Sequence, residues 1–384
     1  MTVKVTRTSD QATRQSDQGR LAIVEPDRHT WDMFTAGHAQ GHLLQSNGWG
    51  ALKQQVGWEA RRLLVIGPDG PRAGAQLLLR RKLGLSVAYI PRGPLLGDSR
   101  EANALLLAAL DRLARRQRAV FLRLEPNVRA DDARAGELHN ALTTEGFRTA
   151  DPLQPRTSLH LDLTPAPEQL LAAMSKGHRA DIRRAAREGV AVRSGQSAAD
   201  LDAFYAIMEQ TATRAAFAIH SREYYRAAWE LFRAPADGSV PPQRDGERAG
   251  GSQLFLAERD GATVAACMIF AWAGVGLYLY GGSTDEGLKS GANHALQWQA
   301  IQWTRASGCQ LYDFWGVPDQ FGLAALAGDQ AERALLEERA KSDPLYGVFR
   351  FKKGFGGQVA RYMPAYDRVY LPPIYALWRR RFGG

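Results

Sequence analysis

The order of predicted strands and helices constrains the fold of this chain more than any single motif does. In its first part, β-type segments separated by Gly, Pro and Asp turns alternate with two helices. The helix at 99–119 is strongly amphipathic with Ser99 as its N-cap, and the earlier helix has Asp27 or Thr30 as its cap. The order is β-α-β-β-β-α-β, at residues 20–26, 27–38, 60–67, 72–84, 85–96, 99–119 and 119–126.

The second part of the chain has a similar order of elements, without a repeat at the level of residues. One long helix is predicted at 168–189 after Pro165 and Pro167, and three strands fall within 253–283. The other predicted elements are strands at 156–164, 190–195 and 309–317 and helices at 197–217, 221–234 and 293–308. This order is that of an acetyltransferase-like (GNAT-type) unit. We therefore predict an α/β (α+β) fold with a lead-in at 1–18 and two such domains at 19–155 and 156–358.

Composition and charge exclude several classes of protein. Cys267 and Cys309 lack CxxC or Cys/His spacing, which favours reduced thiols and no metal site. No signal peptide and no run of about 20 apolar residues is present, so we expect a soluble, cytosolic protein.

The formal net charge of +9 favours polyanionic partners such as RNA, nucleotides or anionic lipid. A basic surface without a specific partner is an equal alternative.

Motifs for the common cofactors and nucleophiles are missing from the sequence. It contains no Walker loop, no GxGxxG after a strand, no HExxH and no GxSxG. These absences argue against redox, kinase and hydrolase chemistry. An enzyme with this layout would work by positioning an activated substrate against a nucleophilic one, as acyltransferases do.

Two helical segments carry candidate binding residues. In 45–59, Trp49 and Lys53 are four residues apart and share a helix face, which could clamp a substrate phosphate or could be an exposed lysine beside a core tryptophan. In 175–190, basic residues recur at helical spacing, which could bind an RNA backbone or form a solvated helix face. The residues of this basic stripe are Lys176, Arg179, Arg183, Arg184 and Arg187.

Strand-like and glycine-rich segments carry further candidates. Arg123 and Glu125 share a strand face, and a buried pair between them is one interpretation. Tyr278 and Tyr280 likewise share a face. The segment "LYGVFRFKKGFGG" at 345–357 alternates aromatic and basic residues before a glycine turn. It could be an amphipathic strand end or a site where phosphate or carboxylate chemistry meets a stacked ring.

Taken in order, these segments resemble the FemABX family, whose members use aminoacyl-tRNA to build the side branch of bacterial peptidoglycan. The matching pieces are "QSNGWGALKQQVGWE", "YIPRGP", "FLRLEP", "PRTSLHLDLTPAPEQLLAAMSKGHRADIRRAAREGV", "LFLAERDGATVAACMIFAWAGVGLYLYGGS", "WQAIQWTRASGCQLYDFWGVP" and "LYGVFRFKKGFGG". They span about residues 21–375. The coiled-coil arm of some relatives is missing, because only the loop at 234–252 stands in its place.

The resemblance implies two acetyltransferase-like domains with a cleft between them, and a tail at 359–384 that packs back on the first domain. It implies a monomer without a cofactor, whose co-substrate is aminoacyl-tRNA. Gly, Ala or Ser would pass to the side-chain amine of the third residue of the stem peptide. The acceptor would be UDP-MurNAc-pentapeptide or lipid II. The protein would be cytoplasmic, and the basic end "LWRRRFGG" could contact the inner face of the membrane or be solvated.

Site residues follow from the resemblance position by position. For the acceptor, Lys53 matches the phosphate-binding lysine, Arg214 and Tyr280 match substrate contacts, and Trp49 lines the rim. For catalysis, Phe351 and Lys352 match the pair that faces the aminoacyl end of tRNA, and Glu125 matches an acidic residue that is a candidate general base. Val120 stands where some relatives have a tyrosine. Contacts to tRNA would come from Lys353, Lys176, Arg179 and Arg183.

The implied reaction is direct attack of the stem-peptide amine on the aminoacyl ester, without a covalent enzyme intermediate. Lys352 would stabilise the developing negative charge, and Gly354, Gly356 and Gly357 would let the acceptor end of tRNA approach the backbone. Two alternatives are an acyl-CoA-dependent N-acyltransferase of the same fold and a non-catalytic protein that binds RNA or the cell envelope. The first would need a phosphate-cradling loop that the sequence does not supply.

Overall fold

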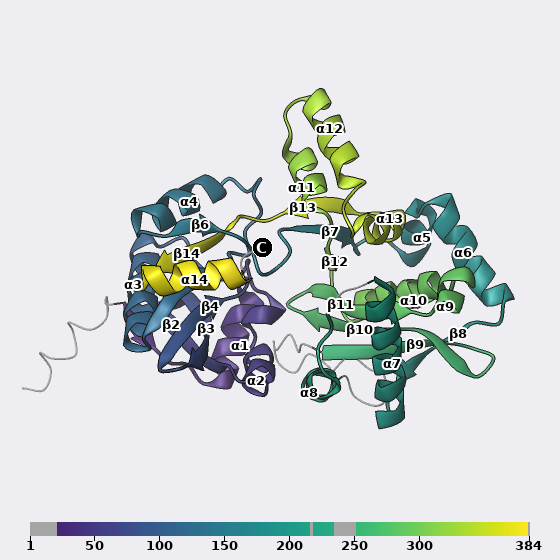
Figure 1. Ribbon diagram of the computed structural model, residues 1–384, viewed down its shortest axis with the longest axis horizontal. Helices are drawn as coiled ribbons and strands as arrows, with labels where there is room; N and C mark the ends of the chain where they lie inside the picture. Colours follow the sequence, from purple (N-terminus) through teal and green to yellow (C-terminus); the bar gives the residue numbers. More distant parts are fainter. Residues whose placement is uncertain (1–20, 216–217, 234–250, 383–384) are drawn as a thin grey trace, which may run out of the picture.

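The computed structural model describes residues 21–215, 218–233 and 251–382, which form two seven-stranded sheets with helices packed on them (Figure 1). The predicted lead-in at 1–18 and nearly all of the loop at 234–252 lie outside the described residues. Within the described residues, no helix is both long and apolar enough to cross a bilayer.

The first sheet is built from five N-terminal strands followed by β14 and β6. Its order is β1-β2-β3-β4-β5-β14-β6, and only the β4–β5 pair is parallel. The strands are β1 (Ala22–Val24), β2 (Glu59–Gly67), β3 (Gly70–Lys82), β4 (Leu85–Ile90), β5 (Ala119–Leu124), β6 (Arg148–Ala150) and β14 (Ala365–Val369). Its helices are α1 (Arg28–Gly37), η1 (Leu43–Gln45), α2 (Asn47–Gln54), α3 (Arg100–Arg116) and α4 (Ala135–Thr144). Asp27 caps α1 and Ser99 caps α3, as predicted.

The second sheet has the same arrangement. Its order, read as β8-β9-β10-β11-β12-β7-β13, again has one parallel pair, β11–β12, between the fourth and fifth strands. The strands are β7 (Thr157–Asp162), β8 (Ala191–Gly195), β9 (Gly251–Arg259), β10 (Ala262–Trp272), β11 (Val275–Ser283), β12 (Leu311–Gly316) and β13 (Gln358–Arg361). The prediction of two domains with one order of elements is thereby confirmed.

Helices cover both faces of the second sheet and extend beyond it. They are α5 (Pro167–Ala173), α6 (Lys176–Arg187), α7 (Ala198–Ala215), α8 (Arg222–Phe232), α9 (Asp285–Lys289), α10 (Ala292–Ala306), α11 (Asp319–Leu326), α12 (Gln330–Ala340) and α13 (Tyr346–Gly354). Three of these, α9, α11 and α12, were not predicted from the sequence, and three more, α5, α6 and α13, contradict the prediction. The helix predicted at 168–189 is broken into α5 and α6, because Ser175 has extended backbone and its hydroxyl caps α6 by accepting from the amide of His178. The segment at 345–357 is mainly the helix α13, so its interpretation as a strand end is wrong.

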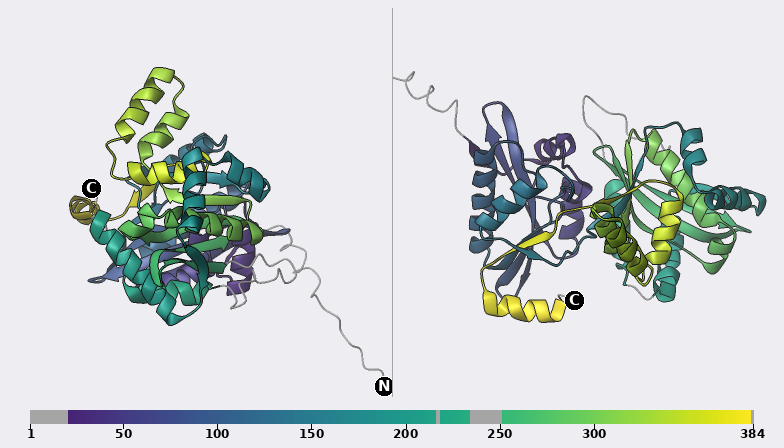
Figure 2. Two further views of the ribbon diagram at one scale, coloured as in Figure 1. Left: turned by 90° about the vertical axis from the view of Figure 1, so that its right-hand side faces the viewer. Right: turned by 90° about the horizontal axis from the view of Figure 1, so that it is seen from above.

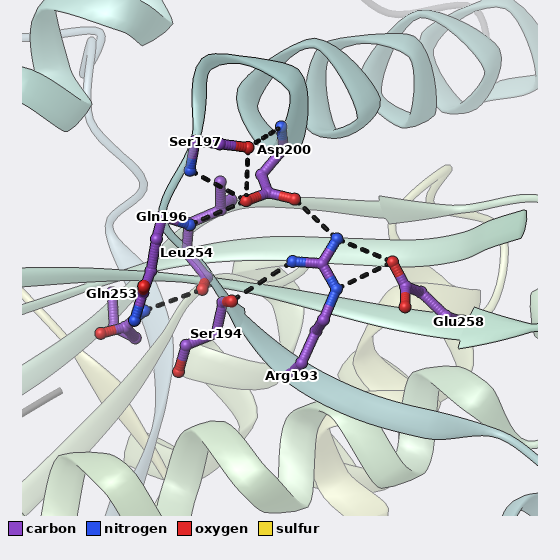
Figure 3. Close-up of polar contacts among 8 residues, drawn as sticks. All are labelled: Arg193, Ser194, Gln196, Ser197, Asp200, Gln253, Leu254 and Glu258. Atoms are coloured by element: carbon purple, nitrogen blue, oxygen red, sulfur yellow. Dashed lines mark hydrogen bonds and ion pairs between the residues drawn. The ribbon is translucent and has the colours of Figure 1, made fainter. Parts of the chain in front are cut away.

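The start of α7 is fixed by a polar network around Asp200 (Figure 3). The Asp200 carboxylate accepts hydrogen bonds from the amides of Gln196 and Ser197, both at 2.9 Å. Arg193, on β8, forms ion pairs with Asp200 and with Glu258 on β9, at 2.6 and 2.8 Å. This network ties α7 to the edge of the sheet, and the opposite end of α7 carries Arg214.

The C-terminal segment crosses from one sheet to the other. β13 still belongs to the second sheet, so the crossing comes after Arg361 rather than at 359. β14 then pairs with β5 and β6, and α14 (Pro372–Phe382) lies along that side of the first sheet (Figure 2). Arg123 on β5 forms two hydrogen bonds of 2.7 Å with Asp367 on β14, and both side chains are buried. The suggested Arg123–Glu125 pair is therefore wrong, because Asp367 takes the place of the glutamate.

One of the apolar clusters contains side chains of both domains. Side chains of η1 and α2, including Leu44, Trp49 and Leu52, pack in one cluster with second-domain residues such as Phe204 and Tyr225. Burying apolar surface from both domains stabilises their contact. This shared cluster brings α2 next to α8, where the first candidate residues meet.

Candidate functional site

Lys53 connects the two domains through aromatic side chains. Ser46 caps α2 by accepting from the amide of Trp49, and Lys53 lies one turn further along. The Lys53 Nζ donates to the Tyr224 hydroxyl on α8 at 3.0 Å. It also lies 4.8 Å from the ring centroid of Trp49 and 4.9 Å from that of Tyr224. The predicted shared face of Trp49 and Lys53 is confirmed.

Tyr280 and His220 complete this cluster. The Tyr224 hydroxyl lies 3.3 Å from that of Tyr280, and the His220 ring stacks on Tyr224 at 3.9 Å. Burial lowers the pKa of Lys53 to about 8, and burial together with the Lys53 charge lowers the pKa of His220 to about 4. No carboxylate in the described part of the chain forms an ion pair with Lys53. The described contacts of Lys53 are one hydroxyl and two aromatic rings, which leave N–H donors on its Nζ for an incoming anion.

Arg214 lies in the last turn of α7, beside the end of β11. Its Nη1 donates to the carbonyl of Ser283 at 2.7 Å and lies 3.3 Å from an oxygen of Asp285. Tyr280 is three residues before Ser283 on the same strand. The structure therefore brings Arg214 and Tyr280 to the same end of β11. The guanidinium of Arg214 is already engaged there by the Ser283 carbonyl and by Asp285.

Tyr278 and Tyr280 do not share a face, contrary to the prediction. The β10–β11 pairing shifts register between Met268 and Ile269, where Met268 pairs with Tyr280 and Ile269 with Tyr278. This bulge inserts one residue and reverses the alternation. Tyr280 packs in the core beside α7 and α8, whereas Tyr278 packs in the other core beside α10.

Lys352 is buried at the second cluster of candidate residues. Only 6% of it is exposed, and its Nζ donates to the carbonyls of Gly316 at 2.8 Å and Trp315 at 3.3 Å. Burial lowers its pKa to about 7, although the negative charge of Asp313 acts in the opposite direction. A lysine held by two backbone carbonyls has one N–H left to donate to a bound molecule.

Phe351 does not face the same way as Lys352. Adjacent residues on a helix point about 100° apart, and here Phe351 packs against His178, His294 and Phe355. The predicted pair facing one end of tRNA is therefore split, with Lys352 directed to the end of β12 and Phe351 to the junction with α6 and α10.

The glycines of this segment serve the protein's own packing. A side chain at Gly354 would collide with the His178 ring at 1.8 Å, and one at Gly357 would lie 2.5 Å from the carbonyl of His160. Gly356 has φ of 101°. Packing within the protein therefore accounts for Gly354 and Gly357, and their role in the approach of the tRNA end stays a prediction.

Glu125 lies against the segment that links the domains. Its carboxylate accepts hydrogen bonds from the Tyr89 hydroxyl and from the amides of Leu153 and Gln154. Burial raises its pKa, and these three donors oppose the rise. Glu125 thus holds the linker, and its role as a general base stays a prediction.

The predicted tRNA-binding residues divide into two groups. Lys176, Arg183 and Lys353 are exposed, and Lys353 donates to the carbonyl of Gly357 at 2.8 Å. Arg179 instead caps the end of α5, where its Nη1 donates to the carbonyls of Ala172 and Met174, both at 2.6 Å. Arg179 therefore stabilises the end of α5, whereas the other three side chains form the exposed basic surface.

The sequence analysis did not identify four residues that surround the Lys352 site. They are Asp313, Trp315, His160 and Arg92. The available indication was a charged residue, Asp313, within the otherwise apolar strand segment 311–315. A cavity of about 570 Å³ between α3 and α4 is lined by none of the predicted site residues.

Comparison with known proteins identifies the family. The model of the FemAB family matches residues 27–237, which is more than half of the chain, and a GNAT acetyltransferase domain matches residues 173–323. The chain belongs to the FemAB family. This FemAB protein is 23% identical over 408 residues to the lipid II:glycine glycyltransferase of Staphylococcus aureus (strain USA300), covering 90% of this chain and 92% of the relative.

Solved structures agree on the fold of this FemAB protein. A crystal structure of FemX superposes with a TM-score of 0.75 at 21% identity, covering 93% of this chain and 99% of FemX. A tandem GNAT protein from the clavulanic acid biosynthesis pathway superposes with a TM-score of 0.52 at 13% identity, covering 91% of this chain and 98% of that protein. The predicted family and the predicted pair of GNAT-type domains are both confirmed.

Proposed function

We propose that this FemAB protein is a peptidoglycan-bridge aminoacyltransferase, which moves Gly, Ala or Ser from aminoacyl-tRNA to the side-chain amine of the third residue of the stem peptide. Similarity to the glycyltransferase over nine-tenths of the chain supports the reaction class. The observation that carries the proposal is the geometry of Lys352, a buried ammonium held by two backbone carbonyls.

In the proposed reaction, the neutral amine attacks the carbonyl carbon of the aminoacyl ester. The new C–N bond forms, the bond to the ribose oxygen breaks, and the proton released by the amine is taken up by that oxygen, which leaves as a hydroxyl. Negative charge develops on the carbonyl oxygen in the transition state, and the remaining N–H of Lys352 is suited to stabilise it. The ester is already activated, so orientation of the two substrates supplies much of the acceleration.

The acceptor side of the site would be the Lys53 cluster. Lys53 would bind a phosphate of the acceptor, with Trp49 at the rim and Arg214 and Tyr280 as further contacts. The donor would be bound by Lys176, Arg183 and Lys353, whose exposed positive charges suit a nucleic-acid backbone. Neither substrate requires a cofactor in this scheme, and a monomer suffices.

The acceptor could be UDP-MurNAc-pentapeptide or the lipid-linked precursor, lipid II. Helix α14 favours contact with the inner face of the membrane, because Ile374 and Leu377 are exposed beside Arg379 and Arg380. Exposed apolar and basic side chains on one helix suit the interface of anionic lipid. Transfer to the lipid-linked acceptor alone would support this location.

The test is transfer of radiolabelled Gly, Ala or Ser from charged tRNA to each acceptor, with wild type beside Lys352→Ala. Transfer that the substitution abolishes would establish the reaction and identify the amino acid. Transfer from CoA esters in place of tRNA would establish an acyl-CoA-dependent enzyme. Binding of tRNA or envelope precursors without transfer to either acceptor would leave a binding protein.

Glu125→Gln tests the remaining catalytic assignment. If Glu125 only holds the linker, the turnover rate should change less than about threefold and its pH dependence should stay the same, because an amide still accepts from Leu153 and Gln154. A loss of about 100-fold or more, with one limb of the pH profile removed, would instead establish a general base.

A further inference from the structure

The turn that ends β12 has a strained geometry beside Lys352. Trp315 has φ of 63°, a left-handed conformation that bulky residues rarely adopt. The β12–β7 pairing shifts register between Asp313 and Gly316, which marks a bulge. Bulges often occur next to functional sites, where they redirect the chain. Here the carbonyls of Trp315 and Gly316 are both directed to the Lys352 Nζ.

Asp313 holds this turn from inside the domain. It is 2% exposed, and its Oδ1 accepts from the amide of Trp315 at 2.7 Å and from the hydroxyl of Ser158. Its Oδ2 lies 3.5 Å from His160 Nε2. Although burial opposes ionisation, the interactions with His160, Ser158 and the Trp315 amide hold the pKa of Asp313 well below its usual value. Asp313 is thus a carboxylate fixed to the amide that begins the strained turn.

Arg92, from the first domain, holds the same turn from the opposite side. Its guanidinium lies 5.0 Å from the ring centroid of Trp315 and 4.1 Å from that of Tyr362. Its Nη2 donates to the carbonyl of Pro155, in the segment between the domains, at 2.9 Å. The Trp315 side chain is therefore fixed by cation–π contact while its amide is fixed by Asp313, and together these contacts offset the strain of the backbone.

We propose that Asp313 is a positioning residue for Lys352: it fixes the Trp315 turn, whose carbonyls hold the ammonium at the point of attack on the donor ester, and Arg92 links this turn to the first domain. This inference rests on the proposed function and deepens it. Asp313 does not contact the reacting atoms in this scheme. It acts through the Trp315 amide and through its charge near Lys352.

The first experiment is Asp313→Asn, read by the titration of Lys352 Nζ in the substrate-free protein. NMR of isotope-labelled lysine, assigned with Lys352→Arg, reports this titration. In the described part of the chain, the charged and titratable groups around Lys352 and its turn include Asp313, Tyr278, His42, His160, Tyr362 and Arg92. Removing the only carboxylate among them should lower the pKa of Lys352 below its wild-type value. In transfer assays, kcat should fall at least about tenfold with KM changed less than about twofold.

Asp319→Asn is the matched control. Asp319 also contacts β7 and β13, through Thr157 and Arg361, but not the Trp315 turn. It should leave the Lys352 titration and the pH dependence of kcat unchanged. An Asp313→Asn protein with an unchanged Lys352 titration and an unchanged pH profile would overturn the proposal. Because the titration needs no substrate, it reports the influence of Asp313 on Lys352 even if no transfer is found.

A second pair of variants keeps the test decisive if Asp313→Asn does not fold. Trp315→Gly and Trp315→Ala both remove the ring, but only glycine adopts positive φ without strain. Transfer by the glycine variant should exceed that by the alanine variant by about fivefold, because the left-handed backbone strains every residue except glycine. Equal activities and equal Lys352 titrations would show that the turn does not position Lys352.

Discussion

Lys53 and Lys352 are both shielded from solvent, but their surroundings differ. Lys53 is half-buried where the domains meet, and its partners are one hydroxyl and two aromatic rings. Lys352 is buried within the second domain, and its partners are two backbone carbonyls near a carboxylate. Burial lowers both pKa values, to about 8 for Lys53 and about 7 for Lys352.

The difference in surroundings suits Lys53 to substrate binding and Lys352 to the chemical step. Lys53 keeps most of its N–H donors and some exposure, so it suits an anion that arrives from solvent and stays charged throughout the reaction. Lys352 has two donors engaged in a rigid frame, so it suits charge that develops at one point in the transition state. In kinetic terms, we expect Lys53 to affect mainly KM and Lys352 mainly kcat.

The largest expected effect is that of Lys352→Ala. Removing a donor directed at developing negative charge should lower kcat by about 100-fold to 1,000-fold while KM for the acceptor changes little. Steady-state transfer assays with charged tRNA measure both constants. A large rise in KM with kcat preserved would contradict the assignment and would make Lys352 a second binding lysine.

Lys53→Ala should have the opposite signature. KM for the acceptor should rise about tenfold to 100-fold with kcat nearly unchanged, because a charged hydrogen bond to phosphate is made equally in the ground and transition states. Lys82→Ala, at an exposed lysine on β3, is the matched control and should behave as wild type. A loss in kcat at Lys53 equal to that at Lys352 would remove the distinction between the two sites.

The stability of the two lysine sites should depend differently on pH. Below about pH 7, Lys352 is charged in both the folded and unfolded states, and its burial is fully unfavourable. Between about pH 7 and the ordinary lysine pKa of 10.5, the folded protein has lost the proton and the unfolded chain has not, so the free energy of unfolding rises with pH. Lys352→Met removes this rise.

Urea unfolding of wild type and variant at several pH values measures this effect. The advantage of Lys352→Met over wild type should shrink by about 3 kcal/mol from pH 7 to pH 10, because the stability of wild type rises by roughly 1.4 kcal/mol per pH unit between the two pKa values. For Lys53→Met the change should be smaller and should begin near pH 8, because that pKa is less depressed. Parallel curves for the two variants would show that the two lysines are equally buried in solution.

Local patterns made much of the fold and the Lys53 site predictable. The caps at Asp27 and Ser99 and the alternation of strands and helices depend on residues close in sequence, as does the shared face of Trp49 and Lys53. Long-range pairing could not be predicted in this way. Arg123 and Asp367 are 244 residues apart, and nothing near Arg123 indicates that β14 enters the first sheet.

The Lys352 site was harder to predict because it depends on irregular backbone. The bulge in β11 reverses the alternation that placed Tyr278 beside Tyr280, and the helix α13 separates Phe351 from Lys352. The role of Asp313 depends on a left-handed residue two positions later. Sequence periodicity assumes regular elements, so it fails where a strand bulges or a helix replaces an expected strand.

The smallest expected effect concerns the donor side of the comparison, on α6. Arg183→Ala should raise KM for aminoacyl-tRNA about threefold, because Arg183 is exposed and one phosphate contact would be lost. The slope of log affinity for tRNA against log salt concentration should become shallower by about one. KM for the acceptor should not change. Filter binding of charged tRNA across salt concentrations measures this slope.

Arg179→Ala is the matched comparison on the same helix. Arg179 caps α5 through two carbonyls, so its loss should lower the free energy of unfolding by about 1 kcal/mol with no change in the salt dependence of tRNA binding. If both variants changed the salt slope equally, Arg179 would leave its cap to contact the donor, and the basic face would be wider than the structure indicates. If neither changed it, α6 would not contact tRNA, and Lys352 would have to receive the donor from another direction.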